Sequence, residues 1–110
     1  MNATKQLAAD FLRWWMDPGS HPDFRSQFAP GFSYRKEPVG LSDEDAVWLI
    51  EQSLPWEEVQ VKSLAFEGDT AVLEIEGIDP VTRLRHRKDL RIVIQGNSVV
   101  SVVERGEILD

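Results

Sequence analysis

Cysteine is absent from the 110 residues of this sequence, which excludes disulfide bonds, thiolate nucleophiles and cysteine-ligated metal sites. The two histidines, His21 and His86, lie far apart in the chain, so no metal site is predicted. The glycines are scattered rather than gathered in a phosphate-binding loop, and no serine lies in a nucleophile-elbow pattern. These absences remove the familiar signatures of metal, nucleotide and nucleophile chemistry, and we predict no cofactor.

Long apolar runs and an excess of positive charge are absent as well. No hydrophobic run approaches the length that a bilayer requires, and the first residues lack the basic stretch and apolar core of a signal peptide. The formal net charge is −7, which repels nucleic-acid phosphates. We therefore expect a soluble, cytoplasmic protein that binds neither membranes nor nucleic acids.

The sequence does contain an ordinary supply of core-forming residues. The hydrophobic fraction is 42% and the charged fraction 28%, as in proteins that bury a core, and the length suits one domain over residues 1–110. Apolar residues recur at helical spacing over residues 3–17, a short helix is expected from Ser20, and a third helix begins at Ser42. A first strand over about 32–37 separates the last two helices.

The second half of the sequence predicts a sheet. Four strand-like runs cover about 57–66, 70–78, 82–95 and 98–105. The turn signals between them are Gly68-Asp69, Asp79-Pro80 and Gly96-Asn97. Helices followed by neighbouring strands define an α+β class, in which the helices cover one face of an antiparallel sheet.

The Asp79-Pro80 turn predicts a register for the two strands that it joins. A tight turn there places Glu74 opposite Arg85 and Glu76 opposite Arg83. This register sorts opposite charges onto one face of the sheet and apolar residues onto the other.

The apolar face of the sheet is expected to pack against the helices. In the same register Leu73 lies opposite His86, and the Gly96-Asn97 turn places Leu90 opposite Val103. The predicted inner-face residues of the last three strands are Leu73, Ile75, Leu84, His86, Lys88, Leu90, Ile92, Ile94 and Val99.

The outer face carries the charged residues, Asp89 among them, and also an apolar strip. Alternation along the strands assigns Val93, Val100 and Val102 to this strip. Exposed apolar strips commonly mark protein contacts, so we predict a homodimer that forms through the outer sheet face.

Three short stretches carry a resemblance to a known superfamily. They are Phe28-Ala29-Pro30-Gly31-Phe32, Glu37-Pro38-Val39-Gly40 and Ile94-Gln95-Gly96-Asn97-Ser98-Val99-Val100-Ser101. Together with the order of elements, they make the whole chain resemble the nuclear-transport-factor-2-like superfamily, which includes SnoaL-like proteins and ketosteroid isomerase. The resemblance implies a cystatin-like α+β barrel, in which three N-terminal helices pack in a cone formed by a highly curved antiparallel β-sheet, with a pocket at the open end.

The resemblance also implies a proton-transfer residue. In ketosteroid isomerase an acidic residue before Pro-Val-Gly moves a proton beside a carbonyl, and Glu37 holds the matching position here. The tyrosine that stabilises the enolate has no match, because Phe11 lies at the nearest position. A second acid of the isomerase would align with Asp89, which alternation places on the outer face. Steroid isomerase activity is therefore not expected.

Candidate residues for a pocket follow from the predicted inner face. His86 is a second candidate acid or base, because histidine titrates near neutral pH. The candidate ligand-binding residues are Phe11, Trp15, Tyr34, Lys88 and Leu90.

Three hypotheses about function remain open. The preferred one is a SnoaL-like domain that binds a small organic ligand in the pocket, with no reaction assigned. The second is an isomerase- or cyclase-like enzyme that uses Glu37 or His86 for proton transfer. The third is a non-catalytic homodimeric interaction module, and the sequence leaves open whether the protein is an enzyme.

Overall fold

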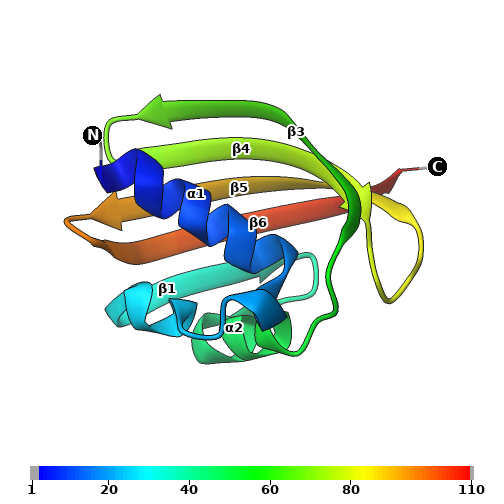
Figure 1. The fold of residues 1–110 in the computed structure, drawn as a ribbon, viewed down its shortest axis with the longest axis horizontal. Coiled ribbons are helices and arrows are strands. Elements are labelled where there is room, and N and C mark those ends of the chain that lie inside the picture. Colours follow the sequence, from blue (N-terminus) through cyan, green and yellow to red (C-terminus); the bar gives the residue numbers. More distant parts are fainter. Residues whose placement is uncertain (1–2, 110) are drawn as a thin grey trace.

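Residues 3–109 are described by a computed structural model, which contains two α-helices and a six-stranded sheet (Figure 1). The helices are α1 (Ala3–Met16) and α2 (Asp43–Glu51). The strands are β1 (Phe28–Glu37), β2 (Leu41–Ser42), β3 (Glu57–Glu67), β4 (Thr70–Ile78), β5 (Arg85–Gln95) and β6 (Ser98–Leu109). The predicted α+β class is confirmed.

The stretch expected to form the second helix contains two short 3₁₀ helices instead, η1 (Pro18–Ser20) and η2 (Phe24–Gln27). Backbone N–H groups in this stretch donate to carbonyls three residues earlier, His21 to Pro18, Phe24 to His21 and Ser26 to Asp23, which is the 3₁₀ pattern. The described residues thus form two α-helices where three helices were predicted.

The strand order in the sheet is β2-β1-β6-β5-β4-β3. β1 and β6 run parallel and the other neighbours run antiparallel, so the sheet is mixed and the prediction of a fully antiparallel sheet is wrong. Figure 1 shows the curled sheet with α1 lying across one face, here called the inner face, and α2 lying near β1. Neither helix within residues 3–109 is long and apolar enough to cross a membrane.

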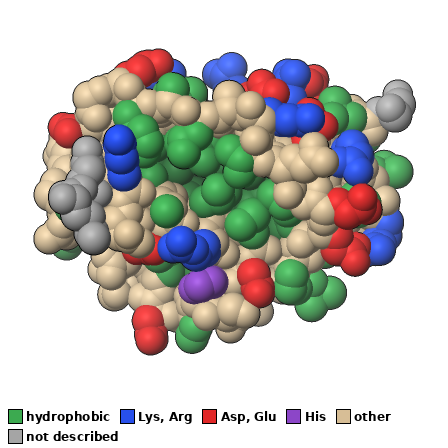
Figure 2. Space-filling model, turned by 45° about the horizontal axis from the view of Figure 1, so that its top comes forward, with side chains coloured by type: hydrophobic (Ala, Val, Ile, Leu, Met, Phe, Trp, Pro, Cys, Tyr) green, Lys and Arg blue, Asp and Glu red, His purple; other side chains and the backbone are tan. Residues whose placement is uncertain are grey.

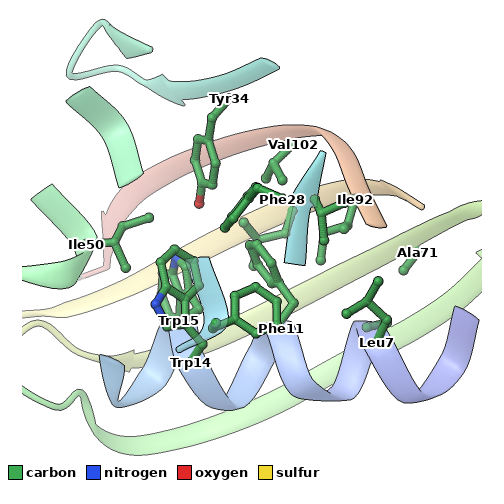
Figure 3. Close-up of a cluster of buried hydrophobic side chains, with 14 of the residues drawn as sticks. Leu7, Phe11, Trp14, Trp15, Phe28, Tyr34, Ile50, Ala71, Ile92 and Val102 are labelled. Carbon is green, nitrogen blue, oxygen red and sulfur yellow. The ribbon is translucent and has the colours of Figure 1, made fainter. Parts of the chain in front are cut away.

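Aromatic side chains dominate the core between α1 and the inner face (Figure 3). The ring of Phe11 meets that of Trp14 edge-on, with centroids 5.5 Å apart, and Trp14 stacks on Phe24 at 5.2 Å. Phe11 also contacts Phe28, at 6.4 Å. Each such pair contributes about 0.5–1.5 kcal/mol beyond the burial of its area, so interlocked rings hold α1 on the sheet.

The β4–β5 hairpin pairs four residues away from the predicted register. Leu73 lies opposite Leu90, and the prediction that it lies opposite His86 is wrong. Because the side chains of a strand alternate with a period of two, a shift of four leaves every paired side chain on the predicted face. His86 and Lys88 accordingly lie on the inner face, and Asp89 is exposed on the outer face. Leu84, which was expected on the inner face, lies in the loop before β5 and is exposed.

The same shift overturns the predicted charge pairs. These pairs were Glu74 with Arg85 and Glu76 with Arg83. Asp89 lies opposite Glu74 in the sheet, and Arg87 lies opposite Glu76. Arg83 and Arg85 form ion pairs with glutamates at the start of β3 instead.

The loop between β4 and β5 is longer than the predicted tight turn because Asp79 organises it. The Asp79 carboxylate accepts hydrogen bonds from the backbone N–H groups of Val81 and Thr82, at 2.7 and 3.1 Å. Its own N–H donates to the carbonyl of Leu84 at 3.0 Å. Aspartate side chains that bond to nearby N–H groups favour such loops over tight turns.

A β-bulge in β6 changes the face of the residues that follow it. Ile94 lies opposite Val99 and Val93 lies opposite Ser101, so Val100 is an extra residue of β6 without a partner in β5. The bulge inserts one residue into the alternation, which moves every later side chain of β6 to the face opposite to the predicted one.

Two predictions fail because of this bulge. Leu90 lies opposite Glu104 rather than Val103. Val102 is fully buried in the core, so its assignment to the outer apolar strip is wrong. Glu104, which was not among the predicted inner-face residues, is fully buried as well.

β3 extends beyond the cover that α1 provides. Its residues Val61 and Leu64 lie opposite Ile75 and Leu73 of the inner face, yet they are 47% and 51% exposed. Figure 2 shows hydrophobic side chains gathered in a hollow on this side of the molecule.

Candidate functional site

A cavity of about 550 Å³ lies at one end of the sheet and is lined by residues of the loop after β4, the turn after β1 and the end of β6. These backbone segments lie toward the right in Figure 1. Much of its wall is apolar. The apolar lining includes Val39, Leu49, Ile50, Trp56 and Val81. The polar lining includes Lys36, His86 and Lys88. An apolar wall with a few polar groups is typical of small-molecule sites of this size.

A buried carboxylate, that of Glu104, lies behind the cavity wall. Its Oε1 accepts hydrogen bonds from the indole N–H of Trp15 at 2.9 Å and from the hydroxyl of Tyr34 at 2.8 Å. Its Oε2 accepts a hydrogen bond from Lys36 and lies 3.3 Å from Nζ of Lys88. We call these five residues the Glu104 cluster. Its internal bonds satisfy a charge that would otherwise be costly to bury.

Four elements deliver the cluster. Trp15 comes from the last turn of α1, and Tyr34 and Lys36 lie two apart on β1 and so share a face. Lys36 is the direct neighbour of Glu104 across the parallel β1–β6 pair. Lys88 reaches the same carboxylate from β5. Figure 3 shows Tyr34 and Trp15 extending into the interior from opposite sides.

Burial and neighbouring charge set the protonation of the cluster. Burial by itself raises the pKa of Glu104, but the charges of Lys36 and Lys88 oppose it and hold that pKa below its usual value. Burial, reinforced by the Glu104 charge, raises the pKa of Tyr34, so its hydroxyl remains a donor. Burial lowers the pKa of Lys88 although Glu104 acts in the opposite direction.

Gly106 provides the space that Lys88 occupies. It lies opposite Lys88 in the β5–β6 pair, and a Cβ atom at position 106 would lie 2.7 Å from Nζ of Lys88. The ammonium group also lies 5.8 Å from the ring centroid of Trp56. Lys88 is thus held between a glycine and an aromatic wall, with its side chain 9% exposed.

His86 lies beside the cavity and is held by the β4–β5 loop. Its Nε2 lies 3.0 Å from Oγ1 of Thr82, and its ring meets that of Trp56 edge-on at 5.9 Å. Burial lowers the pKa of His86 below 6.5, so the ring is neutral at pH 7 and can accept a proton. Among residues 3–109, no three His, Asp or Glu side chains group as ligands for a metal ion.

The structure brings some of the sequence-predicted site residues together. Trp15, His86 and Lys88 line the cavity, and Tyr34 is connected to it through Glu104.

The other predicted residues lie elsewhere. Phe11 and Leu90 are fully buried parts of the core. Glu37 lies opposite Arg105 in the β1–β6 pair, on the outer face and therefore on the other side of the sheet from His86.

Two residues of the cluster, Glu104 and Lys36, were not predicted from the sequence. A glutamate in the valine-rich run of β6 is a signal in retrospect, because an apolar strand seldom contains a lone acid without a partner. Lys36 continues the alternation of Phe32 and Tyr34, which marks it as inward-facing.

Comparison with known proteins identifies the fold. No family model matches the sequence, and no curated protein matches it either. Solved structures do match. An NTF2-like protein of unknown function from Cytophaga hutchinsonii superposes with a TM-score of 0.73 at 13% identity, covering 94% of this chain and 89% of that one.

Two further structures agree with this result. A protein with a ketosteroid-isomerase-like fold from Catenulispora acidiphila, in complex with trimethylamine, has a TM-score of 0.66 at 14% identity, covering 89% and 82% of the two chains. An NTF2-like protein of unknown function from Silicibacter pomeroyi has a TM-score of 0.58 at 20% identity, covering 97% and 93%. The chain therefore has the nuclear-transport-factor-2-like fold, as the resemblance implied. The fold by itself assigns no activity.

Proposed function

We propose that the protein binds a small organic anion in the cavity beside the Glu104 cluster. The observation that carries the proposal is the placement of two lysines against one carboxylate at the wall of a largely apolar cavity. With both lysines protonated, the cluster has one excess positive charge, which attracts an anionic group. The rings of Trp15 and Trp56, stacked 4.9 Å apart, offer an aromatic surface beside it.

The proposal is tested with ligands of one size and different charge. Benzoate, benzyl alcohol and benzylamine are titrated while tryptophan fluorescence is recorded, since Trp15 and Trp56 both line the cavity. We expect benzoate to change the fluorescence saturably and benzylamine to have no effect. Lys36→Met should weaken benzoate binding about tenfold or more, the loss of one charged contact. Arg91→Met, on the exposed outer face, is the matched control. Equal responses to benzoate and benzylamine would contradict the proposal.

Proton transfer by His86 is a second candidate function. It is favoured by the position of a neutral histidine at the cavity wall, with Thr82 fixing the ring. A bound carbonyl compound with an acidic C–H would exchange that hydrogen for deuterium in D₂O. Exchange of cyclohexanone protons, followed by NMR, should fall at least about tenfold in His86→Gln. Exchange unchanged by that substitution would remove this candidate.

A homodimer through the outer sheet face is proposed with a corrected set of residues. Val72, Val93, Val100 and Val103 are half-buried residues of this face. Val103→Glu should shift sedimentation toward the monomer, whereas Leu64→Glu, an exposed residue of β3, should leave it unchanged. A wild-type protein that sediments as a monomer at high concentration argues against the dimer.

A further inference from the structure

The Glu104 cluster sets two lysines against one carboxylate, because the hydroxyl of Tyr34 keeps its proton. Lys36 and Lys88 both contact Oε2 of one carboxylate, and their side chains are only 11% and 9% exposed. A buried ammonium group without a counter-ion of its own is costly. In the empty cavity, release of one proton from one lysine balances the charge of the cluster, as a bound anion does in the occupied cavity.

Lys88 is the lysine better placed to release that proton. Lys36 makes the shorter contact with Glu104, while Nζ of Lys88 lies 3.3 Å from the same oxygen. Burial lowers the pKa of Lys88 and the charge of Lys36 lowers it further, against the attraction of Glu104. A lysine that is neutral at working pH is a nucleophile, and a second cation beside it is a recognised way to make it so.

The amine is accessible from the cavity. Lys88 and Gly106 both line it, and because residue 106 has no side chain, no Cβ atom lies in the space next to Nζ. A carbonyl compound stacked on Trp56, whose ring centroid is 5.8 Å from Nζ, would meet the amine directly.

We propose that Lys88 forms a Schiff base with a small aldehyde or ketone bound in the cavity. This rests on the proposed binding function and adds to its ligands carbonyl compounds, which react while Lys88 is neutral. The Nζ lone pair attacks the carbonyl carbon, a C–N bond forms, and the C=O π electrons move to oxygen. Both protons of the neutral amine end on that oxygen, the C–O bond breaks, water leaves, and a C=N bond results. His86, two residues along β5 and also at the cavity wall, accepts and returns a proton during these steps.

Reductive trapping tests the proposal on the unmodified protein. The protein is incubated at pH 7 with 4-carboxybenzaldehyde and sodium cyanoborohydride, which reduces an imine to a stable secondary amine. Peptide mass spectrometry then gives the labelling rate at each of Lys5, Lys36, Lys62 and Lys88. Lys62, exposed on β3, is the internal reference. We expect Lys88 to be labelled at least about tenfold faster than Lys62, the gain in neutral amine for each unit by which a lysine pKa falls.

Variants and a competitor separate this proposal from ligand binding alone. Lys88→Arg should abolish the fast labelling, Lys62→Arg should leave it unchanged, and excess benzoate should slow it. Labelling of Lys88 no faster than that of Lys62 overturns the Schiff-base proposal even where benzoate binds. Fast labelling of Lys88 in a protein that does not bind benzoate supports the reactive amine and overturns the anion-binding function instead.

Discussion

The β4–β5 and β5–β6 hairpins, which share β5, both differ from the pairing that the sequence predicts, but in different ways. In the β4–β5 hairpin the observed register lies four residues from the predicted one, and every paired side chain stays on its expected face. In the β5–β6 hairpin a single unpaired residue, Val100, moves the rest of β6 to the opposite face. Side-chain direction in a strand has a period of two, so a shift by an even number of residues keeps every side chain on its face, and a shift by an odd number moves it to the other face. Whether the shift is odd or even, here called its parity, thus matters more than its size.

The second hairpin decides the chemistry of the site. If Val100 were paired with β5 instead of bulged, Glu104 would point to the outer face. Lys36 and Lys88 would then have no carboxylate between them. The first hairpin decides only which neighbours flank His86 and Lys88. We therefore expect changes that alter the parity of a strand to lower the free energy of unfolding strongly, and changes that alter only the spacing to lower it little.

The largest effect is expected from two single-residue deletions in β6. Deleting Val103 forces either Val102 or Glu104 out of the interior, which costs at least about 3–5 kcal/mol when the buried charges lose their partner. Deleting Val100 removes the bulge and leaves both residues facing inward, so we expect a loss of only about 1–2 kcal/mol. Urea unfolding measures both values. If both deletions lowered the free energy of unfolding equally, the bulge would not be setting which face the later residues of β6 occupy.

The buried carboxylate should matter far more than an acid on the outer face. Glu104→Gln leaves two lysines without a counter-ion and should lower the free energy of unfolding by about 3 kcal/mol. Glu74→Gln should change it by less than about 0.5 kcal/mol, because Glu74 is half-buried and its neighbour Asp89 has the same charge. Denaturant curves of the two variants at pH 7 give the comparison, and similar values for both would contradict the account of the cluster.

A substitution in the β4–β5 loop should lower the free energy of unfolding only slightly, because a change of spacing in this hairpin leaves the side chains of β4 and β5 on the same faces of the sheet. Asp79→Ala removes two hydrogen bonds to Val81 and Thr82 and should cost about 1 kcal/mol. Amide hydrogen exchange is expected to speed up in the loop and to stay slow in the centre of β5. Fast exchange at Leu90 or Ile92 in this variant would mean that the loop, rather than the sheet, fixes the register.

The smallest effect concerns His86 and pH. Its folded-state pKa lies below the ordinary value of 6.5, so the unfolded chain binds the proton first as pH falls. The free energy of unfolding should therefore decrease below about pH 6.5 and lose this part of its pH dependence in His86→Gln. An NMR titration of the His86 ring checks the cause directly. A midpoint above 6.5 would reverse the sign and remove the explanation.

Much of the fold could be predicted because it depends on local patterns. The periodicity of Leu7, Phe11 and Trp15 matches α1, and the turn residues at Gly68-Asp69 and Gly96-Asn97 mark hairpins that the structure contains. His86, Lys88 and Trp15 were selected as site residues from strand and helix direction alone, and they line one cavity.

The remainder depended on interactions between distant residues. A bulge has no reliable local signal, since Val100 looks like any other strand residue. The energy that favours it comes from burying Val102 and from pairing Glu104 with partners in α1, β1 and β5. The parallel pairing of β1 with β6, which brings Lys36 to Glu104, joins segments that lie 68 residues apart. Amino-acid order by itself determined the segments that form α1, α2 and the long strands, because their periodicity is local. Tertiary structure alone decided that one glutamate and two lysines share the interior, because only packing across the sheet compensates their burial.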